Sequence, residues 1–325
     1  MTDPVIVALD VGGTGIKGAL VRPDGEVHHT QRRPTHAERG PVAVIDAILD
    51  FTEGLAAHAR SDDRDPVAVG LAVPGVVDEA NGVAVWSANL GFRDVPLRDL
   101  VSARLGLPTV LGHDVRAAGV AEARMGLPTV LGHDLGDAGV AEVRLGTGRG
   151  PAHVLFVAIG TGIAAALVVR GAAYSGAHGA AGELGHLVIR PGGTPCGCGG
   201  SGCLEAEASA RAIGQRYADR SGISGATALD VVARAAQGET VAATVWREAI
   251  EALADGLVAA QALYDVDVLV LGGGLAEAGD ALLEPLRDAV QQRITFHRMP
   301  AIIRAVLGTD AGCVGAALLA RELLG

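Results

Sequence analysis

The 325-residue chain is long enough for two domains with separate cores, and its 49% apolar and 19% charged residues exclude a disordered protein. The net charge of −11, with no basic stripe, argues against a nucleic-acid surface, which needs clustered Lys and Arg. No segment reaches the roughly 18 apolar residues of a membrane span, and the N-terminus lacks the pattern of a secretory signal. We therefore expect a cytoplasmic protein.

The chain begins with the pattern of a strand, a glycine turn and a second strand. Residues 4–10 are apolar and end in Asp10, and "VGGTGIKGALV" follows, which predicts a hairpin. Apolar residues at helical spacing predict a helix over 41–60. A buried strand at 67–78, broken at Pro74-Gly75, and a helix at 96–105 are expected next.

The stretch "GLPTVLGHD" occurs twice, at 106–114 and at 126–134, and residues 105–124 and 125–144 are identical at 15 of 20 positions. Each copy predicts a strand, an acid and a helix. One copy fills the sheet, and the other is an insertion whose loop-entropy cost is small. Arg116 of the first copy is replaced in the second by Gly136, which lowers helix propensity. The second copy, however, joins directly to the following segment, "LGTGRG", which is a point in favour of the second copy.

The second half repeats the pattern of the first. Residues 153–169 again predict strand, glycine turn and strand, residues 266–279 a strand, a glycine turn and the start of a helix, and residues 311–325 a helix packed back on the body. We expect two β-rich lobes joined near 115–150, an α/β architecture with a cleft between the lobes. The predicted smaller lobe is 1–125 plus 305–325, and the larger is 126–304, in which 126–145 is the tandem copy of 106–125.

Three glycine turns are candidate anion sites, because a Gly-rich turn lets backbone N–H groups approach a phosphate. The Walker pattern is absent, and a tight hairpin alone would also explain the first turn. Asp10 is placed to hold a hydrated Mg²⁺, and the third turn is expected at a helix N-terminus. The candidate nucleotide residues are Asp10, Gly12, Gly13, Thr14 and Lys17 in the first turn, Thr161 and Gly162 in the second, and Gly272 and Gly273 in the third.

A cysteine cluster follows in "GELGHLVIRPGGTPCGCGGSGCLE". His186, Cys196, Cys198 and Cys203 make a Cys₃His set, the composition of a closed structural zinc site. Free thiols, or a disulfide between two of the cysteines, are the alternative. Two carboxylates next to this loop, Glu183 and Glu205, are suited to accept hydrogen bonds from sugar hydroxyls.

Together these segments resemble the ROK family of sugar kinases and related repressors. The resemblance runs almost end to end: "DVGGTGIKGAL", "VPGVVD", "SANLGFRDVPL", "GHDVRAAGVAEAR", "GTGRG", "IGTGI", "GAHGAAGELGH", "PCGCGGSGCLE" and "LVLGGGL". It implies a two-lobed actin-like, hexokinase-like (ribonuclease H-like) fold that binds ATP and Mg²⁺ between the lobes. It also implies phosphate transfer to a sugar hydroxyl, structural Zn²⁺, and a homodimer or homotetramer.

The resemblance also assigns residues. Asn89 matches a sugar-contacting asparagine, and Glu183, His186 and Glu205 match residues around the sugar. The acid ending "GHD" matches the catalytic base, Asp114 or alternatively Asp134. His113 stands where the family has an asparagine beside the base, and "GTGIAAAL" replaces a glycine-richer turn.

The function implied is ATP-dependent phosphorylation of a hexose, foremost glucose to glucose 6-phosphate. N-acetylmannosamine, N-acetylglucosamine and fructose are alternative substrates, and polyphosphate is an alternative donor. A second alternative is a sugar-binding protein inactivated by the doubled segment. The repressors of the family carry an N-terminal DNA-binding helix-turn-helix, but here the first glycine turn begins close to residue 10 and the chain is acidic. We therefore expect an enzyme with no nucleic-acid or membrane partner.

Overall fold

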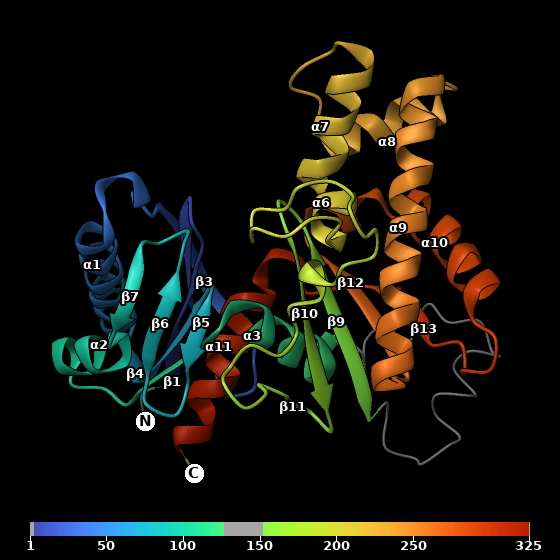
Figure 1. The fold of residues 1–325 in the computed structure, drawn as a ribbon. Coiled ribbons are helices and arrows are strands. Elements are labelled where there is room, and N and C mark those ends of the chain that lie inside the picture. Colours follow the sequence, from blue (N-terminus) through green and yellow to red (C-terminus); the bar gives the residue numbers. More distant parts are fainter. Residues whose placement is uncertain (1–2, 127–151, 325) are drawn as a thin grey trace. The chain divides into compact units, whose positions relative to one another are not determined.

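The computed structural model describes residues 3–126 and 152–324, which divide between two compact units (Figure 1). Unit 1 holds residues 3–126, 171–181 and 309–324, and unit 2 holds 152–170 and 182–308. The predicted boundaries put 171–181 in the larger lobe, whereas the structure groups this segment with unit 1. The reason is that Arg116 and Arg124 donate hydrogen bonds to its carbonyl oxygens. The second copy of the doubled segment lies outside the described residues from residue 127 on, and so does Asp134.

Unit 1 is built on a five-stranded sheet in the order β3-β2-β1-β4-β8. The strands are β1 (Asp3–Val11), β2 (Gly15–Val21), β3 (Val27–Pro34), β4 (Arg64–Val73) and β8 (Thr109–His113). The predicted first hairpin is confirmed, because β1 pairs antiparallel with β2. The strands β1, β4 and β8 are parallel, so their carboxyl ends share one edge of the sheet.

Helices cover both faces of this sheet (Figure 1). Alternate residues of β1 divide between them: Val7 and Leu9 pack in the core under α1, whereas Ile6 and Ala8 pack against α11. The other elements of unit 1 are α1 (Pro41–Ser61), α2 (Leu97–Leu105), α3 (Asp114–Ala121), α11 (Ala311–Arg321), the small sheet β5 (Val76–Asp78), β6 (Val83–Ser87) and β7 (Phe92–Val95), and the short turns Ala37–Arg39, Glu122–Gly126 and Glu322–Leu324.

The C-terminal helix α11 packs back on unit 1, as the sequence predicted. Its backbone approaches the sheet and α3 so closely that two glycines are required. A methyl group on Gly70 of β4 would collide with the Ala316 carbonyl, and one on Gly315 of α11 would collide with the Ala117 carbonyl. The first copy of the doubled segment, as β8 and α3, is therefore built into the core of unit 1.

The strands of unit 2 follow the order β10-β9-β12-β13, which repeats the order β2-β1-β4-β8 of unit 1. The predicted hairpin of β9 and β10 and the predicted strand β12 are confirmed, and β13 is a further strand, parallel to β12. The elements of unit 2 are β9 (His153–Ile159), β10 (Ile163–Val169), the 3₁₀ turns Leu184–His186 and Gly274–Ala278, α6 (Leu204–Ala208), α7 (Ala210–Ser221), α8 (Ala228–Ala236), α9 (Thr240–Tyr264), β12 (Val268–Gly272), α10 (Asp280–Arg293) and β13 (Ala301–Arg304). The short strand β11 (Ala172–Ala173) lies in the segment 171–181 of unit 1, and the 3₁₀ turn Gly308–Asp310 begins at the last residue of unit 2.

The core of unit 2 lies under its long helix α9. Leu253 and Leu257 of α9 pack with Leu155 and Val157 of β9, and all four are at most 1% exposed. Among the helices of residues 3–126 and 152–324, none combines the length and the apolar character needed to span a membrane.

Candidate active site

Two carboxylates lie at the carboxyl ends of the parallel strands of unit 1. Asp10 is the last residue but one of β1, and Asp114 is the first residue of α3, directly after β8. In open α/β sheets, ligands bind outside the carboxyl ends of the strands. The predicted base Asp114 and the predicted cation-binding Asp10 are therefore both at the edge where chemistry is expected.

These two carboxyl groups have raised pKa values. Burial and the neighbouring Asp114 carboxylate raise the pKa of Asp10 to about 7, against the opposite pull of Lys17 and Arg32. Burial raises the pKa of Asp114 to about 6, although Arg116 and a 2.7 Å hydrogen bond from the Val115 N–H lower it. A carboxyl group with a pKa near neutrality is suited to accept and release a proton at working pH.

Lys17 lies across from Asp10 in the β1–β2 ladder, and Arg32 lies across from Lys17 in β3. Directly opposed residues project from the same face of a sheet, so the three charges form one row. The Lys17 ammonium group pairs with the Asp310 carboxylate at the start of α11. A methyl group on Gly312 would collide with the Asp10 carboxylate, so α11 closes directly over this row.

The first glycine turn is held in shape by hydrogen bonds from a residue that the sequence analysis missed. Thr35, which is fully buried, donates its hydroxyl to the Gly12 carbonyl oxygen at 2.6 Å and its N–H to the Thr14 carbonyl at 3.3 Å. In a trans peptide the C=O and the following N–H point in opposite directions. The Gly13 N–H consequently points away from Thr35. The Gly12 N–H closes the turn by donating to the Gly15 carbonyl at 2.8 Å. This predicted phosphate donor is therefore already engaged within the turn.

Asn89 and His113, the two predicted sugar-contact residues of unit 1, differ in exposure. Asn89 is exposed in the loop between β6 and β7, and a methyl group on Gly13 would come within 3.1 Å of its Cβ. The first glycine turn and Asn89 are thus neighbours. His113 is 7% exposed, and its Nδ1 lies 3.3 Å from the Asp114 carboxylate, so its ring faces the base.

The second glycine turn, between β9 and β10, is held by Glu205. The Ile163 N–H donates to the Glu205 carboxylate at 2.9 Å, and a methyl group on Gly162 would collide with that carboxylate. The Ala210 N–H, at the start of α7, donates to the Gly160 carbonyl at 2.8 Å. Thr161 remains exposed at the tip of the turn. Glu205, predicted to contact sugar, therefore has one oxygen engaged in shaping this turn.

The third glycine turn differs from its prediction. Gly272 is buried at the end of β12, where a methyl group would lie 2.7 Å from the Phe156 ring, so it serves packing. Gly273 is exposed, with φ +80°. The helix expected after these glycines is a single 3₁₀ turn, Gly274–Ala278, of which Gly273 is the N-cap, and the α-helix α10 begins only at Asp280.

The four predicted zinc ligands come together in unit 2. Their ligand atoms all lie within 4.8 Å of one another, with Cys196 Sγ 3.7 Å from His186 Nδ1 and Cys198 Sγ 3.7 Å from Cys203 Sγ. Zinc–sulfur bonds of about 2.3 Å in a tetrahedron place two sulfur atoms about 3.8 Å apart. The cysteines are free thiols, so the disulfide alternative is not what the structure contains.

The surroundings of the cluster fix its ligands. The Gly200 N–H lowers the pKa of Cys198, whereas burial raises the pKa of Cys203 to about 12. The second ring nitrogen of His186 lies 3.9 Å from the Glu183 carboxylate, the type of partner that orients a ligating imidazole.

Glu207 is a further residue that the sequence analysis missed. It accepts the Thr194 N–H at 2.9 Å and a hydrogen bond from Arg216 at 3.1 Å. It therefore ties the cysteine loop to α7.

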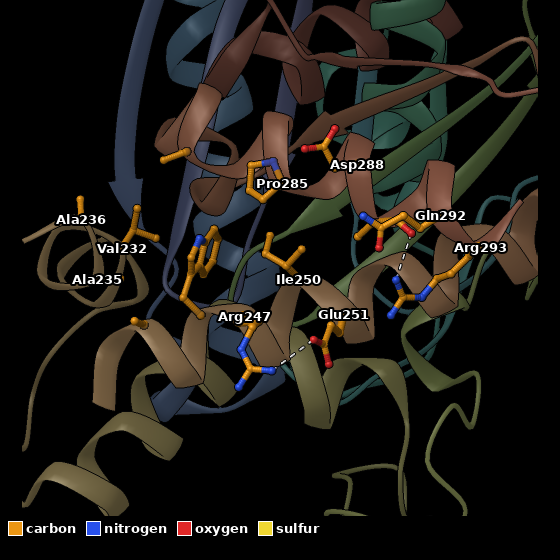
Figure 2. A pocket seen from close by; sticks show the side chains of 14 residues that line it. Val232, Ala235, Ala236, Arg247, Ile250, Glu251, Pro285, Asp288, Gln292 and Arg293 are labelled. Atoms are coloured by element: carbon orange, nitrogen blue, oxygen red, sulfur yellow. Dashed lines mark hydrogen bonds and ion pairs between the residues drawn. The ribbon is translucent and has the colours of Figure 1, made fainter. Parts of the chain in front are cut away.

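Unit 2 also has an open groove of about 630 Å³ between α8, α9 and α10 (Figure 2). Trp246 and Ile250 line it, and so do Arg247 and Glu251, which form an ion pair at 3.4 Å. None of the predicted site residues lines it. The groove therefore does not coincide with the candidate site.

The sequence profile of the ROK family matches residues 6–127 and 121–323. The two matched stretches overlap at 121–127, which spans the junction between the two copies of the doubled segment. Among sequence relatives, a glucokinase of Streptomyces coelicolor is 31% identical, over 97% of each chain. An N-acetylmannosamine kinase of Shigella flexneri is 32% identical, over 97% of this chain and 98% of that one.

Among solved structures, a ROK family glucokinase from Streptomyces griseus, in complex with glucose and AMPPNP, superposes with a TM-score of 0.76. It is 29% identical and covers 98% of this chain and 99% of its own. The fold is therefore the actin-like, hexokinase-like α/β fold that the sequence predicted. The chain belongs to the ROK family and is a sugar kinase.

Proposed function

We propose that this protein phosphorylates a hexose with ATP, foremost glucose to glucose 6-phosphate, and that Asp114 is the general base. The observation that carries the proposal is the Asp114 carboxylate, held at the carboxyl end of β8 with a pKa raised to about 6. A carboxylate of this kind can accept the proton of an attacking hydroxyl. Asn89 and the first glycine turn, which are neighbours in unit 1, supply groups for the sugar and the phosphates.

The phosphate contacts are assigned to the two hairpin turns. Thr14 and Thr161 are exposed at their tips and offer hydroxyl donors. Thr35 and Glu205 hold the turns in shape, so little conformational entropy is lost when an anion binds. Phosphoryl transfer depends mainly on positioning and charge stabilisation, which is what rigid turns provide. In unit 2 we assign Glu183 and His186 to the sugar.

Two metal ions fit the residues present. Asp10 and Asp114 repel one another, and a hydrated Mg²⁺ held by Asp10 would relieve this repulsion and neutralise phosphate charge. The Cys₃His cluster has the donor set and the spacing of a structural zinc site, with no position left for substrate. Zinc would therefore hold the loop that carries Glu183 and His186.

Glucose is the first choice because the Streptomyces griseus relative is a glucokinase in complex with glucose and AMPPNP. N-acetylmannosamine is the second candidate, since a kinase of that sugar is equally similar in sequence. That the enzyme is a homo-oligomer remains our prediction from the family resemblance, and that it is cytoplasmic remains our prediction from the sequence patterns.

A coupled ADP-release assay tests the proposal. With ATP and Mg²⁺, glucose should give the highest kcat/KM among glucose, fructose, N-acetylglucosamine and N-acetylmannosamine. Each sugar is also offered with polyphosphate as donor, where the sugar phosphate is measured because no ADP forms, and sugar binding is measured separately by calorimetry. A higher kcat/KM for an N-acetyl sugar would change the assigned substrate but leave the proposed mechanism as it is. Binding without any turnover would mean that the doubled segment has inactivated the enzyme.

The activity should fall in acid, because the base must be ionised. With the pKa of Asp114 at about 6, kcat/KM for the sugar should drop about tenfold per pH unit below pH 6 and level off above about pH 7. The profile is measured between pH 5 and 8.5, and samples returned from each pH to pH 7.5 show whether the enzyme survived. A flat profile down to pH 5 would contradict the assignment of Asp114.

A further inference from the structure

A buried arginine stands two residues after the proposed base. Arg116, in the first turn of α3, is 3% exposed. Its Nε and Nη2 lie 3.0 and 2.8 Å from Glu79 Oε1, and its Nη1 donates to the Gly179 carbonyl at 2.9 Å. A guanidinium group buried to this degree needs such partners, because an unpaired buried charge is strongly destabilising.

Glu79 holds the chain on both sides of the base. The same oxygen that pairs with Arg116 also accepts the His113 N–H at 3.3 Å, and its second oxygen accepts the Ser175 hydroxyl at 3.4 Å. Asp114 therefore sits between two anchored residues. A general base must keep its position to a fraction of an ångström, and Glu79 with Arg116 provides that restraint.

The same positions distinguish the two copies of the doubled segment. The copies are identical through "GLPTVLGHD", so the strand itself cannot decide which copy enters the sheet. Beyond the acid, the second copy has Gly136 and Asp137 where the first has Arg116 and Ala117. Glycine would leave Glu79 without its cation. Ala117 is fully buried beneath α11, so an aspartate at its place would bury a carboxylate in an apolar contact.

We propose that the Glu79–Arg116 pair positions Asp114 as the base and commits the first copy, rather than the second, to β8 and α3. The positioning half rests on the proposed function, whereas the commitment of the first copy does not. The pair acts on the reaction only through Asp114. Its loss should thus lower kcat more than it raises either KM.

The test compares Arg116→Gln, Arg116→Gly and Glu79→Gln with a matched control, Arg124→Gln. Arg124 lines a small cavity together with Glu79 and Arg116 and also makes an ion pair, with Glu322 at 3.0 Å, but it lies ten residues beyond the base. In the pair variants we expect kcat to fall about 30-fold or more, with KM for ATP within about threefold of wild type, since remote binding groups are untouched. The double variant Glu79→Gln/Arg116→Gln should be no worse than either single one, because the two residues act as a unit.

Hydrogen exchange gives a readout that does not depend on activity. Peptides from the first copy are distinguishable by mass from those of the second through the differences at 115–117. Amides of 109–121 should be protected in wild type and exchange at least tenfold faster in Arg116→Gln and Arg116→Gly, with β1 and the Arg124→Gln control unchanged. If Arg116→Gln does not fold, Arg116→Lys is tested instead. Lysine keeps the charge but lacks the two-pronged guanidinium contact, so its kcat should lie between those of Arg116→Gly and wild type.

The outcomes test separately the two parts of the proposal, which are the positioning of Asp114 and the choice of the copy that forms β8 and α3. Wild-type kcat and wild-type protection in the pair variants would overturn the proposal. Fast amide exchange of 109–121 in wild type would overturn the claim that the first copy forms β8 and α3. Absence of turnover in wild type would remove the proposed function and the positioning half with it, while the exchange data would still decide which copy occupies the sheet.

Discussion

Asp114→Asn should lower kcat for hexose phosphorylation by about 10²–10⁴-fold, the usual contribution of a general base, and leave KM for ATP unchanged. The amide cannot accept the hydroxyl proton, but it is close in size to the carboxylate and can still accept the Val115 N–H bond, now at 2.7 Å. The nucleotide turns do not involve this side chain. A coupled ADP-release assay at saturating sugar and ATP measures the loss.

The same variant should be more stable than wild type at neutral pH. Burial raises the folded-state pKa of Asp114 from 3.8 to about 6, so the ionised form is disfavoured in the fold. The cost is absent below about pH 4 and complete above about pH 6, where it reaches at most about 3 kcal/mol. Asparagine removes it. A gain in denaturant midpoint at pH 7.5 that vanishes near pH 4 would show that activity and stability are opposed at this residue.

Asp134→Asn makes the identical change at the matching position of the second copy and is the control. It should leave kcat at the wild-type value. If Asp134→Asn abolishes turnover and Asp114→Asn does not, the base comes from the second copy, and our assignment is wrong. If neither variant loses activity, the kinase uses a base other than the acid of "GHD".

Part of the secondary structure could be predicted, because the patterns of those segments are local, whereas the helices α6 to α9 were not predicted. The runs before Asp10 and after His153 alternate with glycine turns, and both became hairpins in their sheets. The periodicity at 41–60 became α1. Each of these decisions depends on residues within a few positions of one another. The shared strand order of the two sheets extends this repetition to the topology.

The clustering of His186 with the three cysteines could also be predicted, because three cysteines within eight residues are a spacing typical of metal binding. His186 lies ten residues before the first cysteine, and the structure brings it to Cys196 through a 3₁₀ turn. Here a spacing pattern and a donor set were sufficient.

The residues that hold the site in shape could not be predicted. Thr35 contacts Gly12 across 23 positions, Glu79 contacts Arg116 across 37, and Ser175 contacts Glu79 across 96. No local sequence pattern marks such partners, because residues this far apart in the chain become neighbours only once the whole unit has folded. At Gly272, the phosphate-binding pattern gave no sign of the second constraint, which is the Phe156 ring that leaves no room for a side chain.

Loss of the metal at the Cys₃His cluster should be the second large effect. Cys198→Ser replaces an exposed ligand with a near-isosteric side chain that binds zinc poorly. We expect the variant to lose its zinc, to be destabilised by about 4 kcal/mol or more, and to melt roughly 10 °C lower. Ser201→Ala, in the same loop but outside the ligand set, is the matched control. Metal content by mass spectrometry should be one zinc per chain in wild type and in the control.

The reason for so large an effect is that the loop between the turn Leu184–His186 and α6 contains no helix or extended strand of its own. Apart from the four ligands, its order depends on backbone bonds such as Gly202 N–H to the Thr194 carbonyl at 2.8 Å and on the Glu207 contact at Thr194. Cleavage by protease between 187 and 203 should therefore begin when a chelator removes the metal, and stop when zinc returns. Because Glu183 lies directly before the turn that carries His186, the KM for the sugar should rise more than the KM for ATP. A fully active, protease-resistant Cys198→Ser protein would show that the cluster folds this loop without a metal.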